Sequence, residues 1–147
     1  MTTFIHQASA AVLLIAFTLW LECGGLAVLI VWVRPVLAES NIHELGPWHA
    51  AVLVVRFSAA LIVLQGLEIL VWASFYRWIC LPSWESAFYF STTSYSTIGS
   101  SDVTLPSQWR MLGPLESIIG VLMAGISVSI LFAIVMRLSN VRVTVRR

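Results

Sequence analysis

The sequence contains no lysine, and only 10% of its 147 residues are charged. Arginine supplies every fixed positive charge, and the net charge at neutral pH is +1. A chain this weakly charged offers no electrostatic basis for binding nucleic acid. It also lacks the regular series of arginines on one helix that a voltage sensor needs.

Cysteine is scarce as well. Cys23 falls inside an apolar run and Cys80 lies at the end of another. A disulfide requires its two Cβ atoms to lie close together, and this spacing places the two thiols at different depths. We therefore expect two free, buried thiols rather than a bridge.

Apolar residues are abundant, at 59% of the chain, and the mean hydropathy is +0.92. A soluble domain of this length has too little interior to hide so much apolar surface. Three apolar runs, at residues 8–34, 48–78 and 111–138, each exceed the roughly 20 residues that a spanning helix needs. The sequence therefore predicts an all-α integral membrane protein with a single membrane domain and three transmembrane helices.

Three ionisable residues interrupt the first two spans: Glu22, Arg56 and Glu68. Charged groups inside a bilayer are costly and normally face protein or water. These residues are candidates for an intramembrane ion pair, of which Glu22 with Arg56 is the simplest. Alternatively, the Arg56 side chain extends to the near membrane interface. The sequence leaves both arrangements open.

A short segment between the second and third spans cannot cross a membrane. Leu81-Pro82 ends the second span, and Ser83 with Ser86 or Glu85 predicts a new helix start. Residues 83–96 have the length of a re-entrant helix, and the polar residues 97–102 follow it. Non-helical backbone at membrane depth occurs only where protein buries it or where it lines a watery cavity.

The arginines predict an orientation. Residues 139–147 form a basic tail that carries Arg142, Arg146 and Arg147, with Arg137 just before it. Basic ends lie preferentially on the cytoplasmic side. We therefore expect a multi-pass protein of the cell membrane with a cytoplasmic C-terminus and an outside N-terminus.

This order of elements resembles the pore module of the potassium-channel superfamily over about residues 48 to 138. Ala87-Phe88-Tyr89-Phe90-Ser91 is similar to that family's aromatic-rich pore helix. Ser96-Thr97-Ile98-Gly99 matches the first part of the filter signature, usually Thr-Thr-Val-Gly-Tyr-Gly-Asp, and Asp102 matches its final acid. The first span has no counterpart in the minimal two-helix module.

The resemblance implies a homotetramer in the lipid bilayer that lets monovalent cations pass, without catalysis, cofactor or small-molecule substrate. Backbone carbonyls of such a filter replace the ion's hydration shell. By the resemblance, Thr97, Ile98 and Gly99 hold the cation, and Ser100, Ser101 and Asp102 complete the filter. Potassium is the expected permeant ion, with sodium as a second.

The chain departs from the family pattern at Ser100-Ser101, where the family has Tyr-Gly. Phe90 stands where the family often has a tryptophan that braces that tyrosine. The resemblance therefore implies a wider, wetter outer mouth with weaker discrimination between potassium and sodium. The alternative function is a non-conducting membrane protein that uses the pore fold for assembly or signalling.

Several residues around the loop are expected to support it. Phe90, Tyr95 and Ser96 precede the filter, and Glu116 either pairs with Arg110 or braces the re-entrant segment. Two glycines of the last span, Gly120 and Gly125, are candidate hinges, because glycine lowers the cost of bending a helix. Close helix packing through small residues is the other explanation for both.

Overall fold

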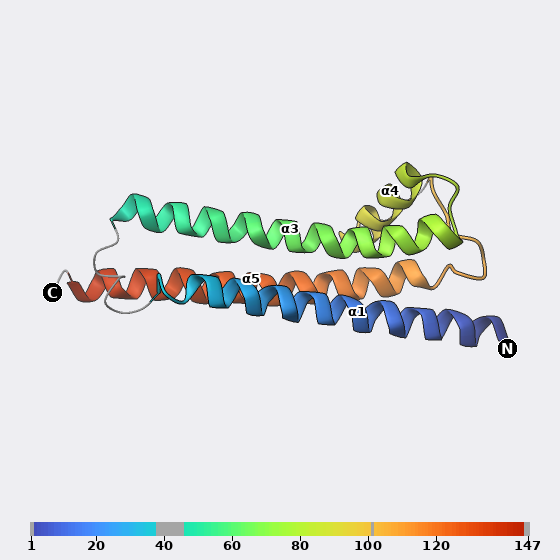
Figure 1. The fold of residues 1–147 in the computed structure, drawn as a ribbon. Coiled ribbons are helices and arrows are strands. Elements are labelled where there is room, and N and C mark those ends of the chain that lie inside the picture. The colour runs from blue at the N-terminus through green and yellow to red at the C-terminus, as the bar shows by residue number, and fades with distance from the viewer. Residues whose placement is uncertain (1, 38–45, 101, 146–147) are drawn as a thin grey trace.

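The computed structural model describes residues 2–37, 46–100 and 102–145 of the chain. Four helices make up most of this part: α1 (Thr2–Val33), α3 (Pro47–Ile79), α4 (Trp84–Tyr95) and α5 (Leu112–Val145). No β-strand occurs within the described ranges. Figure 1 shows α1, α3 and α5 as long neighbouring rods, with α4 beside one end of α3.

Each long helix contains a stretch that is long and apolar enough to cross a membrane: Ile5–Val33, Trp48–Ile79 and Leu112–Ser139. Helix α3 runs antiparallel to α1 and α5 (Figure 1). These features confirm the all-α membrane fold expected from composition. Helix α4, with 12 residues, covers only about 18 Å at 1.5 Å per residue and cannot span a bilayer.

Local signals explain where the helices start and end. Gly46 precedes α3 and Pro47 occupies its first turn, where a missing amide hydrogen costs nothing. The Ser83 hydroxyl oxygen accepts from the Ser86 amide at 3.1 Å, which confirms the predicted start of α4. Helix α5 continues through residues 139–145 of the expected basic tail, because that segment contains neither proline nor glycine.

Both cysteines are free, as expected, but they are not both buried. Cys23 is exposed on α1, and Cys80 is partly buried at the end of α3. The expectation of burial was wrong for Cys23, because a spanning helix has a side that faces lipid instead of protein.

Buried side chains form separate clusters between the helices. One cluster surrounds Phe57 near the start of α3 and includes residues of α1 and α5. A second cluster surrounds Trp72 and Tyr76 and joins α3 to α4. The Trp72 indole nitrogen also donates to the Thr18 hydroxyl at 3.1 Å, so α1 is tied to α3 by a buried hydrogen bond.

Glycine allows α5 to approach the last turn of α4. A Cβ atom placed on Gly120 would collide with the carbonyl oxygen of Tyr95. At Gly125, a Cβ would meet no atom of the described chain within 4 Å. Close packing therefore accounts for Gly120, whereas packing within this chain does not account for Gly125. Both glycines lie inside the continuous helix α5.

We predict opposite effects when alanine replaces these two glycines. Gly120→Ala should lower the free energy of unfolding, because overpacking costs about 1–3 kcal/mol and the obstacle is backbone. Gly125→Ala should raise it by about 0.5–1 kcal/mol through reduced backbone entropy. Thermal unfolding in detergent, followed by tryptophan fluorescence, measures both. Equal stability of the two variants would contradict the close contact.

Candidate functional site

The polar loop begins with an unusual turn at the end of α4. The Thr97 amide donates to the Ser94 carbonyl oxygen at 2.9 Å, and the Gly99 amide donates to that of Thr93 at 2.9 Å. Thr97 has φ 63°, the only positive φ of a described non-glycine residue, and Gly99 has φ 77°. A β-branched residue in this region costs about 1–2 kcal/mol. Backbone strain of this kind concentrates at functional sites.

The chain changes from buried to exposed at the start of this loop. Tyr95 is buried, whereas the next four residues, 96–99, are exposed, and Ile98 is 79% exposed. Asp102 is exposed as well. Among the described residues, no donor is hydrogen-bonded to the carbonyl oxygens of Thr97, Ile98 or Gly99. An apolar side chain is therefore exposed next to three carbonyl oxygens for which the described residues supply no hydrogen-bond donor.

The first part of the outer loop has a hydrogen bond of its own. The Ser100 hydroxyl oxygen accepts from the Val103 amide at 3.0 Å. Residue 101, one of the expected filter residues, lies outside the described residues. Ser96 is exposed, and its hydroxyl donates to the Thr92 carbonyl oxygen at 2.7 Å.

Glu116 connects α5 to both α3 and α4. Its carboxylate is fully buried, and it accepts from the Tyr76 hydroxyl at 2.8 Å and from the Ser91 hydroxyl. Two roles were expected for Glu116, and these hydrogen bonds agree with the second: Glu116 braces the re-entrant segment before the loop. Arg110 is exposed. Tyr76 and Ser91 were not recognised from the sequence as members of this site.

A second hydroxyl fastens α4 to α5. The Ser117 hydroxyl lies 2.6 Å from the Ser94 carbonyl oxygen in the last turn of α4. Phe90 packs edge-on against Tyr76, with ring centroids 5.1 Å apart. Its ring also lies 3.1 Å from where a Cβ of Gly113 would be. Phe90 therefore fills the space between α3, α4 and α5 and makes no polar contact.

Tyr95 is the last residue of α4, and its side chain holds the start of the loop in place. Its hydroxyl lies 2.5 Å from Gln65 Oε1 and is hydrogen-bonded to Glu68 Oε2, both on α3. Burial raises the pKa of Tyr95, and the hydrogen bond to Glu68 raises it further. The phenol therefore stays protonated and acts as a donor.

The expected pairing of Glu22 with Arg56 is wrong. Glu22 Oε1 accepts instead from the Ser127 hydroxyl of α5 at 2.7 Å, and its carboxyl group lies near that of Glu68. Arg56 is exposed on α3. It precedes Glu68 by 12 residues, which is about 18 Å along a helix. The alternative, an arginine extending to the membrane interface, agrees with this exposure.

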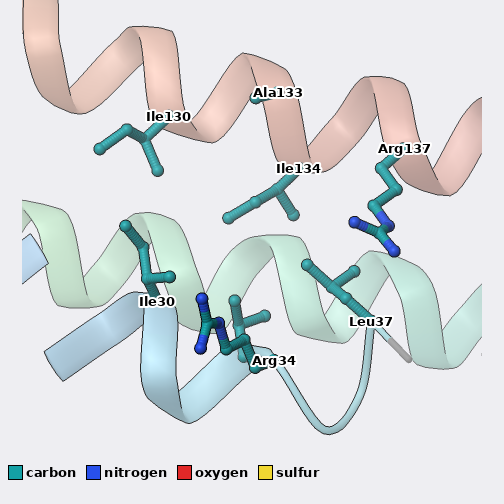
Figure 2. A pocket seen from close by; sticks show the side chains of 8 residues that line it. Ile30, Arg34, Leu37, Ile130, Ala133, Ile134 and Arg137 are labelled. Carbon is teal, nitrogen blue, oxygen red and sulfur yellow. The ribbon is translucent and has the colours of Figure 1, made fainter. Parts of the chain in front are cut away.

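A cavity lies far from the loop, between α1 and α5 (Figure 2). Its volume is about 600 Å³, and its lining residues are Ile30, Val33, Arg34, Leu37, Ile130, Ala133, Ile134 and Arg137. Two arginines face it, and the described lining residues include no acid or hydroxyl. Elsewhere in the described ranges, no three His, Cys, Asp or Glu side chains form a metal-binding group.

Some residues of the site were not predicted from the sequence. The signal that could have indicated them is a polar side chain in an otherwise apolar span. Ser127 and Gln65 lie inside apolar spans, where an unpartnered polar group is costly. Ser91 lies between the spans, directly before further hydroxyl residues. Their partners could not be assigned, because that requires the rotation and axial offset of each helix.

Comparison with known families finds a match, which includes the loop and the helices around it. A family model described as "Ion channel" matches residues 62–137, just over half of the chain. The matched region covers most of α3, all of α4 and most of α5, and it includes the polar loop. Helix α1 lies outside it. No curated protein and no solved structure matches the chain.

Removal of the Tyr76 hydroxyl tests the brace at Glu116. Tyr76→Phe should lower the free energy of unfolding by about 1–3 kcal/mol, because a buried carboxylate oxygen loses its donor. Tyr89→Phe, on the exposed side of α4, is the matched control and should change stability little. Equal effects in thermal unfolding would contradict the proposed role of the hydrogen bond.

Proposed function

This chain belongs to the potassium-channel-like ion channel family, and we propose that four copies of it form a channel for monovalent cations. The carbonyl oxygens of Thr97, Ile98 and Gly99 are the proposed ion ligands. Rings of carbonyls replace the hydration shell of a cation, and adjacent rings let ions displace one another. The observation that carries this proposal is the exposed, strained loop at the end of a buried helix.

The exposed Ile98 and the carbonyls that lack donors among the described residues of a single chain support a tetramer. One copy contributes a single loop, and a closed ring of carbonyls requires several copies around an axis. The carbonyls of 97–99 have no donor among the described residues, and the neighbouring Ile98 side chain is largely exposed. Neighbouring subunits would cover Ile98, and cations would satisfy the carbonyls.

The backbone of the inner part of the loop is suited to this role. The sign of φ alternates from Ser96 (−79°) to Thr97 (63°), Ile98 and Gly99 (77°). Alternation between right-handed and left-handed backbone can bring successive carbonyl oxygens to one side of the chain. The hydrogen bonds from the Thr97 and Gly99 amides back to α4 hold this part in place.

The outer part of the proposed filter differs from the family pattern. Ser100 and Ser101 replace the family's tyrosine and glycine, so hydroxyls and the Asp102 carboxylate would line the mouth. Phe90, which packs against Tyr76, offers no hydrogen bond to this region. We propose that potassium passes with weakened discrimination against sodium.

The arrangement of arginines supports a cytoplasmic C-terminus in the cell membrane. Arg34 and Arg137 face one cavity at the end of the bundle opposite the loop (Figures 1 and 2). Arginines on the cytoplasmic side are favoured. In this orientation the proposed filter lies toward the outside. The geometry gives no reason to assign a catalytic residue.

Cation flux from liposomes that contain the purified protein tests conduction. Flux separates the channel from a non-conducting protein of the same fold, for which no flux above empty liposomes is expected. Native mass spectrometry of the same sample measures the number of subunits. A monomer or dimer in every membrane mimetic tested would contradict the tetramer.

We predict that restoring the family's outer residues increases selectivity. In the wild-type protein, the bi-ionic reversal potential with potassium and sodium on opposite sides should lie near zero. Ser100→Tyr combined with Ser101→Gly should displace it toward potassium selectivity. Ser107→Tyr, in the exposed loop after the filter, is the matched control. Strong potassium selectivity of the wild-type protein would contradict the wider mouth.

A further inference from the structure

The buried acid pair, Glu22 of α1 and Glu68 of α3, lies at a junction of four helices. Both side chains are fully buried, with 0% exposure, and the two carboxyl groups lie close enough to act directly on each other. The Ser127 hydroxyl of α5 donates to Glu22, and the Tyr95 hydroxyl of α4 reaches Glu68. The pair therefore contacts every helix of the described chain.

The hydrogen atoms in this junction are too few for its acceptors. Glu22 Oε1 is satisfied by Ser127 and Glu68 Oε2 by Tyr95, which leaves Glu22 Oε2 and Glu68 Oε1 buried without a donor. A hydrogen bond between two carboxyl groups requires a proton on one of them. Tyr95 also has one hydrogen for two acceptors, Glu68 and Gln65 Oε1. Glu68 is therefore involved both in the carboxyl pair that lacks a donor and in the shared hydrogen of Tyr95.

No positive charge compensates the pair. The two carboxyls interact with Ser127, with Tyr95 and with each other. No described arginine or histidine is among these partners. Across the junction, the titratable groups are Glu22 from α1, Glu68 from α3, Tyr95 from α4 and Glu116 from α5, whose charge acts on Tyr95. Two carboxylates so close together cannot both be ionised without strong repulsion.

We propose that Glu22 and Glu68 form a proton-binding site, in which one shared proton holds α1 against α3 beneath the end of α4. The proton supplies the missing hydrogen between the two carboxyls and removes one buried negative charge. If the chain conducts as proposed above, the site also acts on the filter. Tyr95, which hydrogen-bonds to Glu68, lies two residues before Thr97.

The direction of the pH effect follows from the shared proton. At low pH the proton is bound and the junction is intact. As the pH rises the proton is lost, and two negative charges remain side by side in an apolar environment. The junction is therefore stabilised at low pH, and this stability decreases as the pH rises.

Glutamine substitutions distinguish the effect of the proton from the effect of the side chain's size and contacts. In Glu68→Gln and in Glu22→Gln, the amide NH₂ group can donate to the carboxyl opposite at every pH, and its oxygen can keep the second contact. Glu85→Gln, on the exposed first turn of α4, is the matched control. Glu68→Ala removes both the side chain and the shared proton, so its loss of stability relative to the wild-type protein should be largest at low pH and should shrink as the pH rises.

Thermal unfolding of the full chain in detergent, from about pH 5 to about pH 9, tests the site. The melting temperature of the wild-type protein and of Glu85→Gln should fall by about 4 °C or more as the pH rises. It should stay level in Glu22→Gln and Glu68→Gln. A wild-type melting temperature that does not change with pH would overturn the proposal, as would a fall of equal size in Glu68→Gln.

Infrared spectroscopy of the folded protein provides a direct signature. A protonated carboxyl group in the wild-type protein should give a carbonyl band that disappears at high pH. The Glu22→Gln and Glu68→Gln variants should lack this band, and Glu85→Gln should keep it. If the melting temperature instead follows sodium or potassium concentration at fixed pH and the band is absent, a metal cation occupies the site and the proton assignment is wrong.

Liposome flux measured across the same pH range then tests the link to the filter. Flux through the wild-type protein should decrease as the pH rises, and flux through Glu68→Gln should remain level. Absence of flux from every variant would contradict the proposed channel and leave the infrared and unfolding results as independent measures of the proton site. Flux that decreases equally in both proteins would overturn the link.

Discussion

Hydrogen bonds from the buried side of α4 hold that helix between α3 and α5. This side carries Ser91, Thr93, Ser94 and Tyr95, which is an unusually polar surface for burial in a membrane protein. Ser91 and Tyr95 reach buried carboxylates, and the Ser94 carbonyl oxygen contacts Ser117. Without water in the bilayer, such groups must find partners within the protein. The position of the loop that follows depends on these contacts.

The two parts of the loop are supported to different degrees. Thr97 and Gly99 adopt positive φ, and their amides are bonded back to α4, so the inner part is fixed by the helix that precedes it. In the outer part, the Ser100 hydroxyl oxygen accepts from the Val103 amide. This division coincides with the point at which the sequence leaves the family pattern. The inner part is therefore held by hydrogen bonds to α4, whereas Ser100 is held by a contact within the loop itself.

Helix α1 lies outside the region that matches the ion channel family, yet its polar residues enter the same buried network. Thr18 accepts from Trp72, and Glu22 contacts Ser127 and Glu68. Gly25 allows Leu64 to approach closely, since a Cβ there would collide with the Leu64 side chain. The additional helix is therefore packed into the pore module through specific polar and close contacts. Its polar contacts lead to Tyr95 through Glu68 and also through Ser127 and Gln65.

The sequence alone determined the features that depend on local chemistry. Apolar run length defined the three spans, Pro47 and Ser83 marked helix starts, and the residues around Gly99 identified the loop. Tertiary structure alone decided which polar groups meet inside the bundle. Glu22 faces Glu68 and Ser127 instead of Arg56, because the rotation and axial offset of packed helices set those distances. Residue spacing along one helix defines a face, but it does not define which face of another helix lies opposite.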